Sequence, residues 1–517
     1  MKPAVNKEYL VTQEDAHPPL PASSGKTDSL FTFISNPFDR HQEDDYVDFY
    51  NERGIPRILS REGPKAATAD INGDGLKDIY IGGASGHPGQ LYIQTAEGKY
   101  IKKEEKAFSQ FFSFEDDAVL FFDSDRDGDM DLLLCPGGNN QPPVTPEMQI
   151  RLFRNDGKGN FTIDTKSFPW AGMNISVAID YDFTGDGYPD LFLGGRNYPN
   201  EYGINPHSFL FVNDGTGHFN DIAPKRNPDI AEIGMVTAAA WADITDDPGK
   251  ELVITGEWMA PRIFSYKKDH FIELGTNINE LFGWWQTMSI ADLNGDGKQD
   301  LVLGNVGENF YLKPGEEEPV KLWVSDFDHN DHKNKIITYT VNGKDMPVFL
   351  KNDLQEQLPG IKNRNLKHKQ YAESSIQDLF SSDIISSSMV KEFTYAPSCI
   401  AFNNGGGKFR IEKLPVMSQL SCINSILVTD VNDDGKPDLI TGGNQFGFIP
   451  QFEKLDGNFG EVLINQGNGV FNWQQPTHTG LNIQGEVKDI IELRQNNKRY
   501  FLFLRNNDYP VLYLLRK

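Results

Sequence analysis

Short acidic segments recur along the chain and carry the residue types that bind hard divalent cations. Seven of them follow, closely or loosely, the pattern D-x-[DNT]-x-D-G-x-x-[DE], and they begin at Asp70, Asp123, Asp182, Asp243, Asp292, Asp326 and Asp430. Ca²⁺ takes six to eight oxygen ligands at about 2.3–2.6 Å from segments that can wrap around it. Oxygens at positions 1, 3, 5 and 9 meet that need, and the glycine at position 6 permits a sharp turn. The pattern predicts several structural calcium ions.

Five of the loops are well formed. Their side-chain ligands are predicted to be Asp70, Asn72, Asp74, Asp78; Asp123, Asp125, Asp127, Asp131; Asp182, Thr184, Asp186, Asp190; Asp292, Asn294, Asp296, Asp300; and Asp430, Asn432, Asp434, Asp438. Position 7 offers a backbone carbonyl at Leu76, Asp129, Tyr188, Lys298 and Lys436. A single Asp-Gly loop would be read as a plain turn with side-chain-to-backbone hydrogen bonds. Five copies at matching places in a repeat favour calcium.

The other two loops are degenerate. The fourth keeps its oxygens at Asp243, Thr245, Asp247 and Glu251, but Pro248 replaces the glycine. The sixth offers Asp326, Asp328 and Asn330, with Asp331 at the glycine position and Asn334 at the end. Metal occupancy is open at both.

The elements around the loops are strands. A small or β-branched segment precedes each loop, and a hydrophobic segment such as DIYIGG, DLFLGG or DLITGG follows it. Hairpins with turns such as RNDG, VNDG and FNNG come next, because Asn and Gly adopt the positive φ that tight turns require. An EF-hand is excluded, since that motif needs flanking helices and Glu at position 12.

Each unit therefore reads as four antiparallel strands that cannot bury both faces alone. Stacking such sheets radially buries them, which predicts an all-β fold, a β-propeller of four-stranded antiparallel blades. A linear β-solenoid is the competitor, although its rungs are usually shorter.

The count of sheets reaches eight when LFTFIS near the N-terminus joins the three C-terminal strands and closes the ring. Seven blades remain open, because the fifth unit has no clear fourth strand and could share one blade with the sixth. Residues 1–28 are expected to be an extended linker and 29–517 the propeller. Apolar residues at helical spacing predict a small helical insertion over 352–392, within the sixth unit.

Charge and composition narrow the function. The formal charge of −25 disfavours nucleic acid and anionic membrane surfaces as partners. No run of 18 apolar residues and no signal peptide are present, so we expect no transmembrane segment in this chain. Three cysteines are too few for a disulfide framework.

The cassettes, with the GG that follows the second strand, resemble FG-GAP or VCBS repeats of the integrin α-chain propeller type over residues 66–474. The stretches GEWM at 256, GWWQTMSIADLNGDGKQDLVLGN at 283 and KLWVSDFDHND at 321 are more narrowly similar to CRTAC/UnbV-type VCBS proteins of Bacteroidetes. The resemblance implies an extracellular or cell-surface protein, outer-membrane-anchored where a lipoprotein signal lies upstream. It also implies a place near TonB-linked nutrient-uptake systems.

The expected function is a calcium-stabilised binding or scaffold module for a glycan, a peptide or a partner protein. Propeller ligands commonly contact loops between strands, and here the segments after the second strand offer amide and aromatic groups. The predicted ligand-binding residues are Arg196, Asn197, Tyr198, Glu257, Trp258, Trp284, Asn305, Asn309 and Asn444. Each has an alternative role in turns or in the core.

Catalysis is the alternative function. A polysaccharide lyase or hydrolase on a propeller frame would need carboxylates outside the loops, such as Glu257 or Glu308. The sequence contains neither G-x-S-x-G nor H-E-x-x-H. A mainly structural role, as an adhesin or a subunit of a surface complex, is the third possibility.

Overall fold

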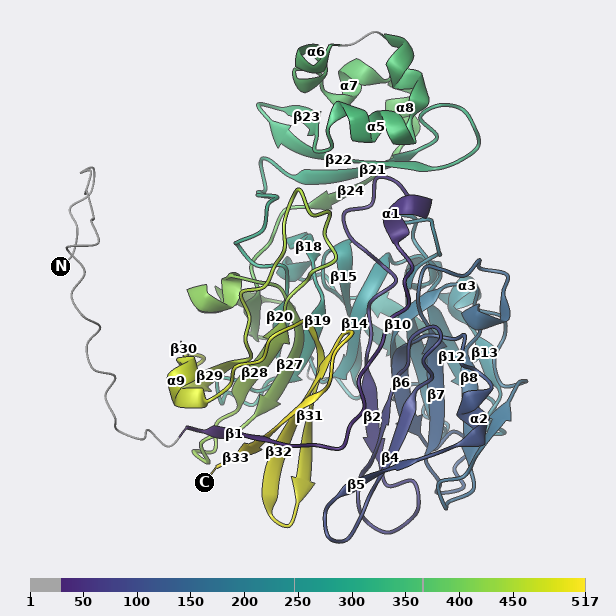
Figure 1. The fold of residues 1–517 in the computed structure, drawn as a ribbon, viewed down its shortest axis with the longest axis vertical. Helices are drawn as coiled ribbons and strands as arrows, with labels where there is room; N and C mark the ends of the chain where they lie inside the picture. Colours follow the sequence, from purple (N-terminus) through teal and green to yellow (C-terminus); the bar gives the residue numbers. More distant parts are fainter. Residues whose placement is uncertain (1–28, 246, 365–366, 517) are drawn as a thin grey trace, which may run out of the picture.

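Eight antiparallel sheets carry the fold. The computed structural model describes residues 29–516 except 246, 365 and 366, so the predicted linker 1–28 lies outside the described residues. Each sheet has four strands, and one gains the two-residue strand β18 (Gly283–Trp284). Seven sheets form a ring of blades (Figure 1). The predicted β-propeller is therefore confirmed.

The first four blades each follow the chain without interruption. Blade 1 consists of β2 (Ala66–Ala69), β3 (Asp78–Ile81), β4 (Gln90–Gln94) and β5 (Tyr100–Lys103). Blade 2 consists of β6 (Asp116–Phe122), β7 (Asp131–Pro136), β8 (Arg151–Asn155) and β9 (Phe161–Asp164). Blade 3 consists of β10 (Asn174–Tyr181), β11 (Asp190–Asn197), β12 (Phe209–Asn213) and β13 (Phe219–Asp221). Blade 4 consists of β14 (Met235–Ala242), β15 (Glu251–Met259), β16 (Arg262–Lys267) and β17 (His270–Glu273).

The last three blades use more distant segments. Blade 5 pairs β19 (Thr287–Ala291) and β20 (Asp300–Gly304) with β25 (Cys399–Asn403) and β26 (Phe409–Lys413). Blade 6 consists of β27 (Ile423–Thr429), β28 (Asp438–Gly443), β29 (Glu461–Asn465) and β30 (Phe471–Trp473). Blade 7 consists of β31 (Val487–Gln495), β32 (Lys498–Arg505), β33 (Val511–Leu515) and β1 (Phe31–Ile34).

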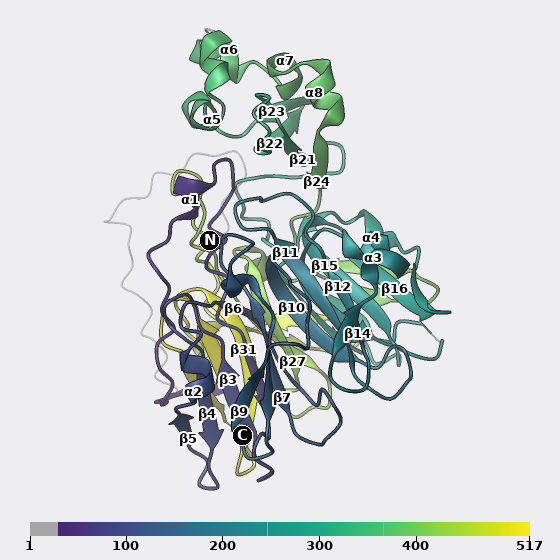
Figure 2. The same cartoon turned by 90° about the vertical axis from the view of Figure 1, so that its right-hand side faces the viewer.

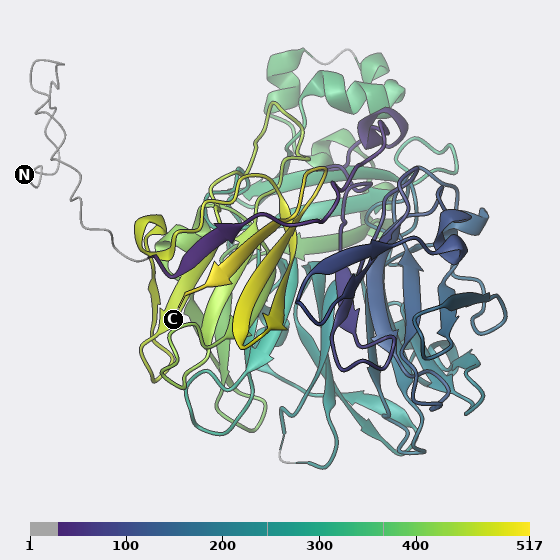
Figure 3. The same cartoon turned by 60° about the horizontal axis from the view of Figure 1, so that its bottom comes forward.

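The two ends of the described chain close the ring. Strand β1 pairs antiparallel with β33, with Phe31 opposite Leu515 and Ile34 opposite Leu512, and Figure 3 shows the purple strand beside the yellow ones. Blade 7 then packs on blade 1, where Leu502 and Ile79 share one apolar cluster. Closure by the N-terminal strand is as the sequence predicts.

The eighth sheet is not a blade. It contains β21 (Val320–Ser325), β22 (Asn334–Val341), β23 (Lys344–Pro347) and β24 (Met389–Phe393), all inserted between β20 and β25. Figures 1 and 2 show it with its helices as a separate lobe at one end of the ring. The helices are α5 (Lys351–Gln357), α6 (His368–Ala372), α7 (Ile376–Leu379) and α8 (Ser382–Ser387), with a 3₁₀ turn at Pro359–Arg364.

The sixth unit is therefore not a blade of its own, and the alternative of seven blades, in which the fifth and sixth units share one blade, is correct. The hairpin IAFNNGGGKFRI completes blade 5, because β25 pairs with β20 rather than with any strand of the inserted sheet. The range 352–392 covers the helices and most of β24, inside an excursion of the chain that begins after β20.

The inserted sheet is covered on both faces. Trp323 and Ile336 pack against the helices, while Leu322 and Ile337 face the ring and join an apolar cluster with Trp284. The segment between β1 and β2 also enters this cluster, through Ile55 and Leu59. This end of the propeller is thus sealed by two segments that belong to no blade.

Short helices complete the connections. They are α1 (Asp48–Asn51), α2 (Lys106–Ser109), α3 (Ala223–Arg226), α4 (Pro228–Ala231) and α9 (Pro476–Thr479), with 3₁₀ turns at Pro146–Met148, Asn277–Glu280 and Val416–Gln419. Within the described residues, no helix has the length and apolar character needed to cross a bilayer. The three cysteines are buried and unpaired.

Candidate functional site

Six of the seven predicted metal loops join the first and second strands of blades 1 to 6. They lie at the end of the ring opposite the inserted lobe, since the first strand of every blade runs the same way. The loop that begins at Asp326 instead joins β21 and β22 of the inserted sheet. Blade 7 has a short turn at this place.

The position-1 aspartate organises each well-formed loop. In blade 1, Asp70 accepts hydrogen bonds from the backbone N–H groups of Gly73 at 2.8 Å and Gly75 at 2.7 Å. Both glycines have positive φ, +74° and +81°, which explains why the turn uses this residue. Both bonds recur at Asp182 and Asp292, and Asp430 keeps the one from Gly435 N–H. The position-1 aspartate therefore has the same role in these four loops.

The next oxygens turn back over the chain in the same way. Asn72 Oδ1 accepts from Asp74 N–H at 3.0 Å, and Asp74 Oδ1 accepts from Leu76 N–H at 2.8 Å. Each oxygen uses one lone pair in these bonds and keeps another. The donor set is oxygen only, which suits Ca²⁺ rather than a softer metal.

The position-9 carboxylates are buried and tie the loop to the blade. Asp78 accepts from Gln94 N–H at 2.8 Å and from Ile71 N–H at 3.3 Å. Burial raises the pKa of Asp78 to about 6, and it raises the pKa of Asp190 to about 6 as well. These residues were predicted as ligands. The structure shows that each already has backbone donors on both oxygens.

Loop 2 has the densest set of carboxylates. Asp123, Asp125 and Asp127 bring oxygens within 4.8 Å of one another, the one such group of three acidic, histidine or cysteine residues among the described residues. The Oδ1 atoms of Asp123 and Asp125 are buried without a hydrogen-bond partner. Such atoms are costly unless something binds them, so this loop fits a cation. Arg154 lies 3.1 Å from Asp125 and also from Asp131, and supplies part of the compensating charge.

The two degenerate loops differ from each other. In loop 4, Pro248 has no N–H to donate, and the position-5 carboxylate of Asp247 is held by Lys267 at 2.7 Å. In loop 6, Asp326 accepts from the N–H groups of Asn330 and Asp331, each at 3.0 Å. The wrapped conformation of the good loops is thus kept in loop 6.

Loop 6 keeps that conformation without a glycine. Asp331 itself adopts φ +65° at the glycine position. Asp328 Oδ1 and Asn334 Oδ1 are buried without a hydrogen-bond partner. The residues of loop 6 fit a cation better than those of loop 4.

Sequence reasoning missed a set of buried asparagines that connect the loops. Asn213 on β12 donates its side-chain amide to Ser124 O in loop 2 of the preceding blade, at 2.8 Å. Its backbone N–H donates to Asp190, the position-9 carboxylate of its own blade, at 3.0 Å. The same pair of bonds is made by Asn155, Asn403 and Asn465. The signal was the Asn that begins each RNDG-type turn, which was interpreted only as turn chemistry.

The predicted ligand face is closed. Glu257 is fully buried and contacts Arg57 at 2.7 Å and Arg196 at 2.8 Å, which together hold the pKa of its carboxyl far below the ordinary range despite burial. Tyr202 O–H donates to its other oxygen at 3.0 Å. Charge pairs of this kind hold segments together and leave no carboxylate free for a ligand.

Most of the other residues predicted to bind a ligand are also buried. Asn197, Trp258, Trp284, Asn305 and Asn444 are each 3% exposed or less, whereas Tyr198 is half-buried and Asn309 exposed. The prediction of an open surface was wrong for the buried residues. Trp258 and Trp284 are covered because they lie in the apolar cluster that the β1–β2 segment and the inserted sheet join.

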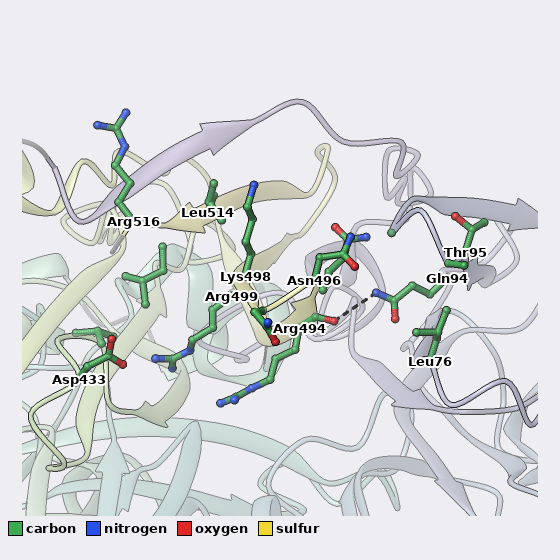
Figure 4. Close-up of a pocket in the computed structure, with 16 residues that line it drawn as sticks. Leu76, Gln94, Thr95, Asp433, Arg494, Asn496, Lys498, Arg499, Leu514 and Arg516 are labelled. Carbon is green, nitrogen blue, oxygen red and sulfur yellow. Dashed lines mark hydrogen bonds between the residues drawn. The ribbon is translucent and has the colours of Figure 1, made fainter.

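An open groove lies at the loop end instead. It has a volume of about 1030 Å³ and is lined by residues 76, 94–96, 98, 431, 433, 494–499 and 514–516 of blades 1, 6 and 7 (Figure 4). We call it the basic groove. Arg499 pairs with Glu492 at 2.9 Å and donates to Asp430 O of loop 7, so it is structural.

Two further cations of the basic groove are exposed. Arg494 lies 2.9 Å from Glu492, and its side chain is 74% exposed. Lys498 is exposed and has no carboxylate within 4.0 Å in the described part of the chain. In a protein with a formal charge of −25, this is a local excess of positive charge.

Family models match two parts of the chain. A model described as an FG-GAP-like repeat matches residues 70–134, and one described as an FG-GAP repeat matches residues 284–317. The first covers loops 1 and 2, and the second begins on β18 and runs through loop 5. No curated protein matches the sequence.

Solved structures give weak likenesses. The Dos1 propeller has a TM-score of 0.40 at 10% identity over 91% of this chain and 97% of its own. YCF48 bound to D1 peptide has a TM-score of 0.38 at 9% identity, over 94% of this chain and 100% of its own. The biofilm matrix protein Bap1 of V. cholerae has a TM-score of 0.36 at 10% identity, over 93% of this chain and 92% of its own. At these scores none bears on function.

The sheets themselves define the class, a seven-bladed β-propeller with an inserted lobe. Within that class, it is a propeller that contains FG-GAP repeats.

Proposed function

We propose that the protein is a calcium-braced binding module that takes an anionic ligand in the basic groove. The observation that carries the proposal is the groove itself, which is built from the metal loops of blades 1 and 6 together with the exposed cations Arg494 and Lys498. Calcium in those loops would fix the groove walls, so binding would depend on calcium. Acidic residues elsewhere would repel an anion and direct it to this groove.

Among the expected ligand classes, glycan, peptide and partner protein, we favour an acidic glycan. The groove is open, and carboxylate or sulfate groups of a sugar chain match its exposed lysine and arginine side chains. A peptide rich in acidic residues offers the same charges, and the binding assay below distinguishes the two.

The experiment is calorimetric titration with acidic oligosaccharides, neutral oligosaccharides and acidic peptides, in calcium and in EGTA. We expect the acidic sugar to bind in calcium, and Lys498→Glu with Arg494→Glu to weaken binding at least tenfold, about 1.4 kcal/mol. Lys369→Glu is the control, because Lys369 is an exposed lysine on α6 of the inserted lobe, at the end of the ring opposite the groove. Equal binding by the groove variant and the control would exclude the groove.

We propose a secreted or cell-surface location, outer-membrane-anchored and accessory to a TonB-linked uptake complex. The FG-GAP repeats and the sequence resemblance support this proposal. Surface labelling of intact cells tests the location, and co-purification from native membranes tests for a transporter partner.

We favour binding over catalysis. The two carboxylates considered for a glycan-cleaving enzyme are both engaged, Glu257 by two arginines and Glu308 by Lys413 at 2.6 Å. A reducing-end assay on the same sugars measures any cleavage directly.

A further inference from the structure

The axis of the propeller is lined by one repeated position. In blades 2, 3, 4, 6 and 7, the pairing of the first two strands slips by one residue, which leaves a single bulged residue without a partner on the second strand. The bulged residues are Asp117, Ser176, Thr237, Asn424 and Lys488. β-bulges of this kind re-aim a side chain out of the regular alternation.

These five residues line one cavity. Lys65, directly before β2, and Gln286, directly before β19, supply the corresponding positions of blades 1 and 5. Glu62 and Arg196 complete the lining, and the volume is about 40 Å³. A water molecule requires about 10–15 Å³ of such space, so the axial cavity has room for a small ion or a few waters and is too small for a sugar ring.

The uncharged side chains that line the axial cavity are satisfied by hydrogen bonds between blades. Ser176 Oγ donates to Val236 O of the next blade at 2.6 Å, and Thr237 Oγ1 donates to Trp285 O of the next at 2.8 Å. Asn424 donates in the same direction to Val487 O at 3.0 Å. These side chains form a belt that needs no ligand.

The cationic side chains that line the axial cavity are not fully satisfied by such hydrogen bonds. Arg196 uses Nη2 on Glu257, but its Nη1 is buried without a hydrogen-bond partner. Lys488 is 3% exposed and has no carboxylate within 4.0 Å in the described part of the chain. Lys65 Nζ donates a hydrogen bond to Lys488 O at 2.6 Å. Lys65 also has no carboxylate within 4.0 Å among the described residues. Three buried or half-buried cations thus surround one small space.

We propose that the axial cavity binds a small monovalent anion, of the size of a halide or a single carboxylate group, through Arg196 and Lys488. A buried cation without a partner is costly, and an anion shared by two of them would satisfy both. The anion would also connect blades 3 and 7 across the axis. This site is separate from the basic groove and does not depend on the proposed function.

Two carboxylates line the axial cavity and could oppose an anion, Glu62 and Asp117. Glu62 is already paired with Arg57 at 2.5 Å, which holds its pKa below the usual value despite burial, so the charge of Asp117 decides which ion fits. For Asp117 the environment favours the neutral form. Both of its carboxylate oxygens are buried without a partner. Burial and the nearby Glu62 and Glu43 raise its pKa well above the ordinary value, against the opposite effect of Arg196 and Lys488. A protonated Asp117 is neutral and can donate, as Ser176 does from the same position. Were it ionised, the cavity would suit a cation instead.

The test is thermal unfolding of the full chain at saturating calcium, fixed pH and fixed ionic strength. Gluconate, which is too large for the cavity, is replaced by chloride, bromide or acetate, and in a second series sodium is replaced by N-methylglucamine at constant chloride. We expect Tm to rise by about 1 °C or more with the small anions and to be unchanged by the cation. Halide and acetate series compared with each other distinguish the two anion sources.

Two variants distinguish an anion site from a cation site. Lys488→Met should reduce the anion-dependent shift at least threefold, whereas Asp117→Asn should keep it. Lys166→Met, an exposed lysine that follows β9 and lies in neither the axial cavity nor the basic groove, is the control. A shift that follows sodium and disappears in Asp117→Asn would show a cation site, and no shift in either series would show water only; both results overturn the proposal.

A direct measurement covers the case in which Lys488→Met does not fold. Crystals of the unmodified protein soaked in bromide should give an anomalous peak in the axial cavity within hydrogen-bond distance of Arg196 Nη1. Absence of that peak, with bromide sites visible elsewhere, would also overturn the proposal.

Discussion

Replacing Asn213 by alanine should destabilise two blades at once. The side-chain amide donates to Ser124 O at 2.8 Å and to Pro189 O at 3.2 Å, and its Oδ1 accepts from Gly215 N–H at 3.1 Å. Asn213 is 1% exposed, so water cannot replace these bonds. Leaving a buried acceptor unsatisfied costs about 1–3 kcal/mol. We expect a loss of about 3 kcal/mol, a factor of more than 100 in the folding equilibrium.

The assay is urea denaturation in saturating calcium, read as the shift in midpoint at unchanged slope. Calcium titration of the folded variant adds a second readout, because Ser124 lies in loop 2 while Asn213 belongs to blade 3. We expect weaker calcium binding at loop 2 as well.

The matched control is Asn220→Ala, an exposed asparagine on the adjacent strand β13. Surface substitutions of this kind usually change stability by less than about 0.5 kcal/mol. If the two variants were equally stable, the buried asparagines would not connect the blades as argued.

Three further predictions concern charged groups. Chelation with EGTA should lower Tm by several degrees, since each loop filled at 100 times its Kd adds about 2.7 kcal/mol; an unchanged melting curve would exclude structural calcium. Glu43 has its pKa raised to about 7, chiefly by burial, so its protonated form is favoured on folding and stability should fall as pH rises from about 4.5 to about 7. The free energy of unfolding of Glu43→Gln, relative to that of the unmodified protein, should therefore rise by up to about 3 kcal/mol from pH 5 to pH 8. A difference between the two proteins that stays constant over this pH range would contradict the prediction. Glu257→Gln should destabilise by about 3–5 kcal/mol in urea denaturation, because Arg57 and Arg196 lose their shared carboxylate, whereas a surface ligand residue would show no loss.

Local sequence patterns were enough to predict the blades. The Asp–Gly loops, the strands on either side and the Asn–Gly turns are all short-range signals, and each was found where expected. The N-terminal strand could be predicted because three C-terminal strands were one short of a sheet.

Contacts between segments that are far apart in the sequence could not be predicted. The turn around Asn403 has the same chemistry whichever strand it joins, so the sequence did not show that β25 pairs with β20. Burial of Glu257 and Trp258 depends on Ile55 and on the inserted sheet, which contact them from far away in the chain. A polar residue after a buried strand looks the same in sequence whether solvent or another segment covers it.

The place of the inserted lobe has a consequence for folding. Eight residues separate β3 from β4 in blade 1, from 82 to 89, whereas 94 residues separate β20 from β25, from 305 to 398. The closure entropy of a flexible loop rises by about 0.6 kcal/mol per doubling, so the longer connection costs about 2 kcal/mol more. That cost disappears when the lobe folds first, because β21 and β24 are paired neighbours and bring the two ends together. Blade 5 would then assemble around a prefolded unit, which makes this connection the natural place to exchange one lobe for another.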